Sequence, residues 1–175
     1  MKKTSLLFSL LTLFIFSFSS TQAADKEQMI KEWERAKAYT KLYLETMPED
    51  GYAFKPTPEI RSFAEQMMHI ADANFGFAAM ASGTKSPIER GAAEKATDKS
   101  KEATTKMVLD SYDFVINAIK GMNDTQMGEM MKFAGRDMTK ELAIAKCFEH
   151  QTHHRGQATV YIRLKGIKPP NEMLF

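Results

Sequence analysis

The sequence predicts an all-α protein, specifically a four-helix bundle, and three observations support this class. Helix-forming residues (Ala, Met, Glu, Lys and Leu) dominate every long segment. Runs of alternating Val, Ile and Thr, which are typical of strands, are missing from the sequence. Apolar residues recur at helical spacing in four long stretches separated by turn residues. The length of 175 residues suits one domain with a substantial core.

The N-terminal segment, residues 1–23, has the pattern of a cleavable secretory signal peptide. A basic start at Lys2 and Lys3 is followed by an apolar run and then by small polar residues that end at Ala23. The apolar run is shorter than the roughly twenty residues that a membrane span needs, although an uncleaved anchor is the alternative. We therefore expect an exported protein, periplasmic or secreted, whose mature domain comprises residues 24–175.

Two helices are expected in the first half of the mature chain. The first runs from about Asp25 to Glu45, with Trp33 on its apolar stripe, and ends at the sequence MPEDGY. The second is expected to begin at Thr57, because Thr-Pro-Glu offers an N-cap, a proline at the first helical position and an acidic first turn. It continues to about Ser82, where Gly83 ends it.

Two further long helices are expected in the second half. Ser86-Pro-Ile-Glu has capping-box spacing, which predicts a short helical turn before a third helix over about residues 98–122. Residues 123–138 are ambiguous and are expected to form a loop with a short helix. The fourth helix runs over about residues 139–165 and ends at Gly166, before a double proline.

Charge and cysteine content exclude some classes of function. Removal of the signal leaves 22 basic residues against 22 acidic ones, since the chain has 24 Lys and Arg and loses two lysines. A neutral domain without a basic cluster does not suit nucleic acid. Nothing in the mature domain suggests a membrane partner. The single cysteine, Cys147, cannot form an internal disulfide, so the core alone must hold the fold together.

Three of the four histidines lie within five residues, in the stretch HQTHHRGQ that begins at His150. Residues four apart on a helix project about 40° from each other, so His150 and His154 share one face. That face also carries Cys147 and Ala158 and is apolar, whereas the face of His153 is polar. We therefore expect His150 and His154 to point towards the core.

The fourth histidine, His69, lies near the packing face of the second helix. Buried imidazole nitrogens need partners, and three imidazoles with an open position are typical of catalytic zinc sites. His69, His150 and His154 are therefore predicted to bind one divalent metal. The alternative is that His69 is a histidine at the edge of the core with an ordinary hydrogen bond.

The two histidine motifs resemble the DinB family. The resemblance rests on Met68-His69-Ile70 and on HxxHHRGQ followed by an aromatic residue, Arg, Leu, Gly and a double proline. It covers most of the mature chain and implies a four-helix bundle in which His69, His150 and His154 hold a divalent metal. Zn²⁺ is expected first, with Ni²⁺, Fe²⁺ and Mn²⁺ as alternatives. Relatives in the family also suggest a homodimer.

Four other residues are candidates for roles near this site. Glu65, one turn before His69, is the first candidate for a general base, with a solvated surface position as the alternative. Cys147 is interpreted as a small buried residue or, alternatively, as a fourth ligand that would close the site. Tyr161 either donates its hydroxyl near the site or only packs. Arg155 either supports the site or is an exposed polar residue.

A divalent metal held by three histidines suggests hydrolysis or group transfer on a small-molecule substrate. The family resemblance adds that some relatives act as thiol-dependent transferases and isomerases. The expected export contrasts with the cytosolic thiols that transferases of the family use. Two other functions remain open. One is a non-catalytic module that binds or senses metal, and the other is a bundle that acts through a partner surface.

Overall fold

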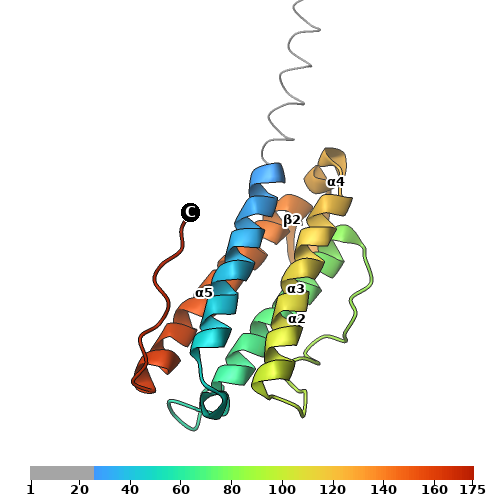
Figure 1. The fold of residues 1–175 in the computed structure, drawn as a ribbon. Helices are drawn as coiled ribbons and strands as arrows, with labels where there is room; N and C mark the ends of the chain where they lie inside the picture. Colours follow the sequence, from blue (N-terminus) through green and yellow to red (C-terminus); the bar gives the residue numbers. More distant parts are fainter. Residues whose placement is uncertain (1–25) are drawn as a thin grey trace, which may run out of the picture.

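The computed structural model describes residues 26–175 and shows a bundle of four long helices (Figure 1). Shorter elements join them: a 3-10 helix η1 (Glu49–Gly51), a short helix α4 (Asp124–Gly128) and a two-stranded hairpin. The long helices are residues 26–46, α2 (Phe63–Ser82), α3 (Lys101–Gly121) and α5 (Lys140–Leu164). The expected bundle is thus confirmed, and the predicted signal peptide lies outside the described residues.

Helix α2 begins five residues later than the sequence suggested, since its N-cap is Ser62 instead of Thr57. Ser62 is its N-cap and forms a capping box with Glu65, whose carboxylate accepts the Ser62 amide at 2.8 Å. Thr57, the expected cap, instead accepts the amide of Ile60 at 3.4 Å in a turn. Both segments carry N-cap chemistry, and the one that leads directly into a buried apolar face starts the helix.

The ends of the other two long helices agree with the prediction to within a few residues. Ser100 caps α3 and Thr139 caps α5, each with its hydroxyl accepting an amide three residues later. Gly166, with φ of 76°, provides the left-handed residue that follows α5. The short helical turn expected at Ser86 does not form, because the Ser86 hydroxyl bonds to Ile88 in a local turn.

The ambiguous segment contains the expected short helix, α4, and also a β-hairpin that the sequence did not predict. Strands β1 (Met130–Phe133) and β2 (Arg136–Thr139) pair antiparallel, with Phe133 opposite Arg136. The turn between them has positive φ at Ala134 and Gly135, which suits a two-residue hairpin. Phe133 stacks on Phe77 of α2 at a centroid distance of 4.3 Å, which anchors the hairpin to the bundle.

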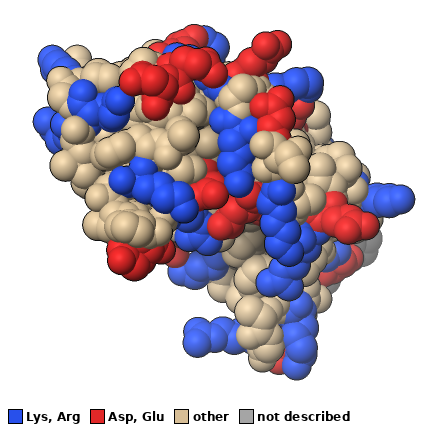
Figure 2. All heavy atoms as spheres, turned by 90° about the horizontal axis from the view of Figure 1, so that it is seen from below, with Lys and Arg blue, Asp and Glu red and all other residues tan. Residues whose placement is uncertain are grey.

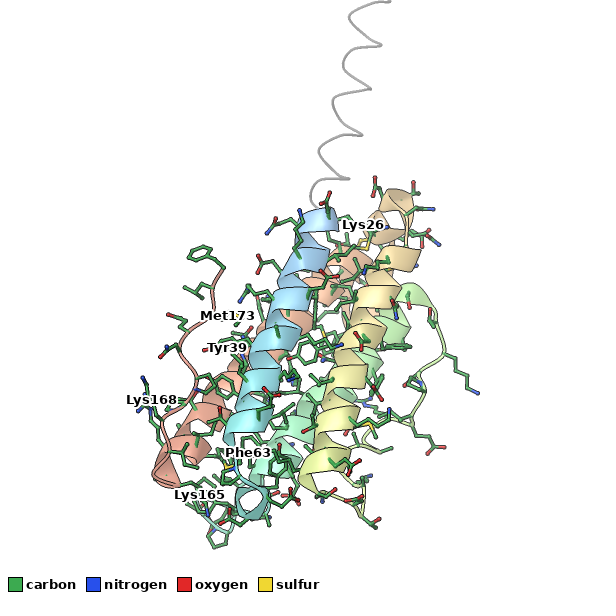
Figure 3. The ribbon with its side chains drawn as sticks, in the orientation of Figure 1. Lys26, Tyr39, Phe63, Lys165, Lys168 and Met173 are labelled. Atoms are coloured by element: carbon green, nitrogen blue, oxygen red, sulfur yellow. The ribbon has the colours of Figure 1, made fainter. Side chains whose placement is uncertain are left out.

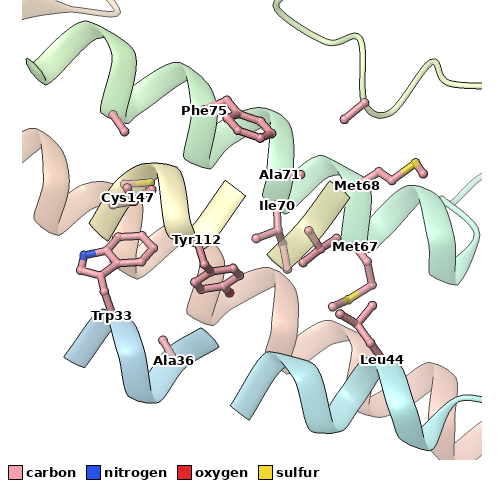
Figure 4. Close-up of a cluster of buried hydrophobic side chains, with 14 of the residues drawn as sticks. Trp33, Ala36, Leu44, Met67, Met68, Ile70, Ala71, Phe75, Tyr112 and Cys147 are labelled. Atoms are coloured by element: carbon pink, nitrogen blue, oxygen red, sulfur yellow. The ribbon is translucent and has the colours of Figure 1, made fainter. Parts of the chain in front are cut away.

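The core lies between the four long helices and is rich in methionine and aromatic side chains (Figure 4). Helix α2 packs against both α3 and α5. The fully buried Trp33 joins the first helix to these two, because its ring meets Tyr112 of α3 and Phe148 of α5 edge-on. The direct packing of α2 on α5 brings together the two helices that carry the histidines.

The chain ends in a tail that runs back beside the first helix, with Met173 close to Tyr39 (Figure 3). Arg35 holds the tail by donating to the Met173 carbonyl at 2.5 Å. On the face shown in Figure 2, acidic groups lie among the basic ones. Within residues 26–175, no helix combines the length and apolar character that a membrane span requires.

Candidate metal centre

Helices α2 and α5 bring His69, His150 and His154 into one cluster. The ring centroids lie 5.1 Å apart for His69 and His150, 4.5 Å for His69 and His154, and 4.4 Å for His150 and His154. His153, as expected, is exposed on the neighbouring face of α5. The spacing along α5 supplies two rings, and the packing of α2 on α5 supplies the third.

The donor set fits a divalent metal ion. One ring nitrogen from each histidine lies within 4.8 Å of the others, and among residues 26–175 no cysteine or carboxylate joins this group. In addition, Nδ1 of His150 is buried without a hydrogen-bond partner in the described chain. An unpaired buried nitrogen costs free energy, whereas a bound metal would use its lone pair.

The two histidines of α5 are in the protonation state that a metal ligand needs. Burial, followed by the neighbouring imidazoles, lowers the pKa of His150 to about 4. The same causes lower the pKa of His154 to about 3. Both rings are therefore neutral near pH 7, which is the state in which an imidazole can coordinate a metal.

We expect the metal-free protein to lose stability as the pH falls from about 7 to about 5. Both histidines have a folded-state pKa below the ordinary value of about 6.5, so below that pH the unfolded chain takes up protons that the folded one does not. Solvent screening of these half-buried rings limits the loss to about 1 kcal/mol, or about 3 °C in Tm. Thermal unfolding followed by circular dichroism measures it.

A double variant, His150→Ala with His154→Ala, is the control for this pH dependence. Its Tm should change less than that of the parent between pH 7 and pH 5. The two imidazoles are gone, and the carboxyl groups of the protein titrate mainly below this interval. Equal slopes in the two proteins would contradict the assignment.

A loop carboxylate, which the sequence did not indicate, contacts the cluster from outside. Glu94 lies in the connection between α2 and α3, and its Oε2 is 2.9 Å from Nδ1 of His69. Arg61 donates to the same carboxylate through Nε at 2.7 Å. Burial raises the pKa of Glu94, but the hydrogen bonds from Arg61 and His69 outweigh it and leave the pKa below its usual value. Glu94 is therefore ionised near neutral pH.

His154 also has a hydrogen-bonding neighbour on the opposite helix. The side-chain amide of Gln66, one turn before His69, lies 2.9 Å from Nδ1 of His154. Gln157 holds that amide through a further hydrogen bond and also contacts His153. Gln66 lies three residues before His69 on the buried face of α2, so the sequence spacing could have predicted that it lies near the histidines. Glu94 offered no such signal, because it lies in a loop without a periodic pattern.

Glu65, the candidate general base, is engaged in structural contacts. Its carboxylate accepts the Ser62 amide and lies 3.2 Å from Nζ of Lys99 and 3.4 Å from Nζ of Lys55. The hydrogen bond from the Ser62 backbone is the main cause that lowers the pKa of Glu65 to about 2. A carboxylate with so low a pKa is a poor proton acceptor near neutral pH, so the geometry favours a helix-capping role.

Three other candidates are not members of the histidine cluster. Cys147 is fully buried, its thiol contacts Asn74, and burial raises its pKa, which agrees with its interpretation as a small core residue. Tyr161 donates its hydroxyl to the Arg61 carbonyl at 2.9 Å and so joins α5 to the segment before α2. Arg155 is buried, not exposed, and stacks over the ring of Tyr39.

Arg155 makes its hydrogen bonds on the side of α5 that faces the first helix. Its guanidinium donates to Gln151 at 2.8 Å and to Thr40 at 3.2 Å. Tyr112 donates to the same Gln151 oxygen at 2.9 Å, so a buried polar network links three helices. Arg155 thus stabilises the interface between the first helix and α5.

Comparisons with known proteins agree with this architecture. The sequence profile of the DinB family matches residues 19–173. A DinB-like protein from Bacillus cereus ATCC 10987 has a similar structure, with a TM-score of 0.73 at 20% identity over 83% of this chain and 96% of that one. The DinB-like protein YjoA from Bacillus subtilis has a TM-score of 0.65 at 20% identity, over 85% of this chain and 96% of its own.

Two proteins of Bacillus subtilis strain 168 are similar in sequence. YjoA, described as uncharacterised, is 24% identical over 143 residues, which cover 79% of this chain and 90% of YjoA. YrdA, also described as uncharacterised, is 32% identical over 72 residues, which cover 38% of this chain and 43% of YrdA. Neither name states a substrate.

Proposed function

The chain belongs to the DinB family, and from this membership and the three-histidine cluster we propose that it is a metal-dependent enzyme acting on a small molecule. The proposed reaction is hydrolysis or group transfer of the thiol type. The observation that carries the proposal is a donor set of three histidines without a fourth protein ligand among residues 26–175. Three protein donors with open positions are typical of catalytic metal sites, and four are typical of structural ones.

A divalent ion at this centre would supply a Lewis acid that polarises a substrate oxygen or activates water or a thiol near neutral pH. The residues of the chain prepare the centre in three ways. His150 and His154 stay neutral because of their burial. Gln66 and Glu94 hold the rings of His154 and His69 from outside. His69, with a side chain 26% exposed, leaves an approach for a small substrate.

Zn²⁺ is the first candidate for the metal, because three imidazoles with an open position are typical of zinc enzymes. Ni²⁺, Fe²⁺ and Mn²⁺ are alternatives, since imidazole binds several divalent ions and availability often decides between them. We further propose export to the periplasm or the exterior, which rests on the signal-peptide pattern of residues 1–23.

Metal analysis combined with a substrate screen tests the proposed function. We expect protein purified without chelators to contain about one divalent ion per chain, as for a mononuclear three-histidine site. Small esters, amides and thiol adducts would then be assayed with the metal-loaded and the chelator-treated protein. Turnover that needs the metal supports an enzyme, and full turnover without metal contradicts the proposal.

A non-catalytic module that binds or senses metal is the second candidate. The contacts of Glu65 favour it, because the carboxylate expected to serve as a base is held by Ser62 and two lysines. Bound metal without turnover on any substrate class would support this second function. An absence of metal would oppose both functions and favour a bundle that acts through its surface.

A further inference from the structure

The loop between α2 and α3 is tied to α2 close to His69. The carboxylate of Asp72, three residues after His69, accepts the backbone amides of Ala93 at 3.1 Å and Glu94 at 2.9 Å. Ala93 itself is buried, with 1% of its surface exposed, and joins the hydrophobic core. The backbone at Glu94 is therefore anchored twice to the helix that carries the histidine.

The side chain of Glu94 is held as firmly as its backbone. Arg61 makes a bidentate interaction with the carboxylate, donating from Nε at 2.7 Å and from Nη2 at 3.3 Å. Oε2 of the same carboxylate also lies within hydrogen-bond distance of Nδ1 of His69, at 2.9 Å. A bidentate interaction between a guanidinium and a carboxylate fixes the orientation of the carboxylate as well as stabilising its charge. Arg61, Asp72 and Glu94 thus form a supporting frame outside the imidazole of His69.

An ionised carboxylate can only accept hydrogen bonds, so the ring of His69 must donate from Nδ1. A neutral imidazole has one donor nitrogen and one acceptor nitrogen, and Nε2 then keeps the lone pair. The proton on Nδ1 thereby assigns Nε2 as the nitrogen that is free to bind a metal.

We propose that Glu94 is a positioning residue that fixes the tautomer and ring orientation of His69 so that Nε2 faces the metal. This inference rests on the proposed function, because it assigns a role within the same centre. Metal-binding histidines commonly donate their second nitrogen to a carboxylate, which also increases the basicity of the ring. Direct coordination by Glu94 is not the geometry found, since Glu94 lies outside the cluster of mutually close donor atoms.

Metal affinity in a matched pair of variants is the first test. Glu94→Ala removes the carboxylate that contacts His69, while Glu89→Ala removes an exposed carboxylate of the same charge from the same loop. We expect the Kd for Zn²⁺, measured by competition with a chromophoric chelator, to rise about 10–100-fold in Glu94→Ala. Glu89→Ala should keep the parental Kd. Equal affinities in the two variants would overturn the proposal.

A conservative variant distinguishes loss of the hydrogen bond to His69 from a general loss of order in the loop. Glu94→Gln keeps an acceptor oxygen for Nδ1 but loses the charge, so its Kd should lie between those of the parent and Glu94→Ala. The visible spectrum of bound Co²⁺, which depends on the geometry of the ligands, should change in Glu94→Ala and stay close to the parent in Glu94→Gln. A Gln variant as impaired as the Ala variant would contradict a role through the hydrogen bond.

The tautomer itself can be read without any metal. Long-range ¹H–¹⁵N spectra of the labelled, metal-free protein distinguish a protonated Nδ1 from a protonated Nε2. We expect His69 to carry its proton on Nδ1 in the parent and in Glu89→Ala, and to lose that preference in Glu94→Ala. A proton on Nε2 in the parent would overturn the inference. This readout is independent of turnover, so it still decides the role of Glu94 if the enzyme proposal fails.

Discussion

His154→Ala is expected to abolish metal binding at the centre and, with it, all metal-dependent turnover. The variant loses one of three donor nitrogens, and two imidazoles that hold an ion without a third are a much weaker site. The loss in affinity for Zn²⁺ should exceed the roughly 10–100-fold that removal of an outer hydrogen-bonding partner costs. Metal content after dialysis and a direct Zn²⁺ titration measure the change.

His153→Ala is the matched control for this experiment. His153 is adjacent in sequence and on the same helix, but it is exposed and lies outside the cluster. This control should bind metal as the parent does. Loss of metal in both variants, or in neither, would show that the cluster of His69, His150 and His154 is not the binding site.

Trp33→Ala is expected to have the largest effect on stability. Trp33 is fully buried, and its ring lies 5.8 Å from that of Tyr112 and 5.3 Å from that of Phe148. Replacement leaves a cavity where three helices meet, which typically costs about 3–5 kcal/mol. For a chain of this size that corresponds to a fall in Tm of about 10 °C. Urea unfolding followed by circular dichroism measures the free energy of unfolding.

An exposed apolar residue provides the comparison for Trp33. Val160 is 53% exposed, so Val160→Ala should change the free energy of unfolding by no more than about 0.5 kcal/mol. Trp33→Phe fills part of the cavity and should fall between these two variants. A Trp33→Ala protein as stable as Val160→Ala would show that the first helix does not depend on this contact.

The positions of the long helices were predictable because helical periodicity and capping residues are local signals. Ser100 and Thr139 cap α3 and α5 close to the expected starts. The start of α2 was misplaced, because Thr57 and Ser62 both offer capping chemistry and only the packing of Phe63 in the core selects between them. The hairpin around Gly135 was missed because its strands are only four residues long and none of their residues is buried.

The cluster of His69, His150 and His154 was predictable for a different reason. Helix geometry alone places His150 and His154 on one face, and the apolar residues beside them show that this face points inward. His69 was assigned because it was the one remaining histidine outside the last helix and lay on an expected packing face. The structure brings all three rings together, with centroids no more than 5.1 Å apart.

By itself, the sequence determined the all-helical class, the face of α5 that carries His150 and His154, and the family to which the chain belongs. These properties depend on residues close together in the chain. Only the tertiary structure decided that Glu94 contacts His69 and that Lys99 and Lys55 hold the carboxylate of Glu65. It also showed that Arg155 makes its hydrogen bonds towards the first helix. Those roles depend on contacts between residues that are far apart in the sequence. The packing of the core brings such residues together, and a local sequence pattern does not reveal it.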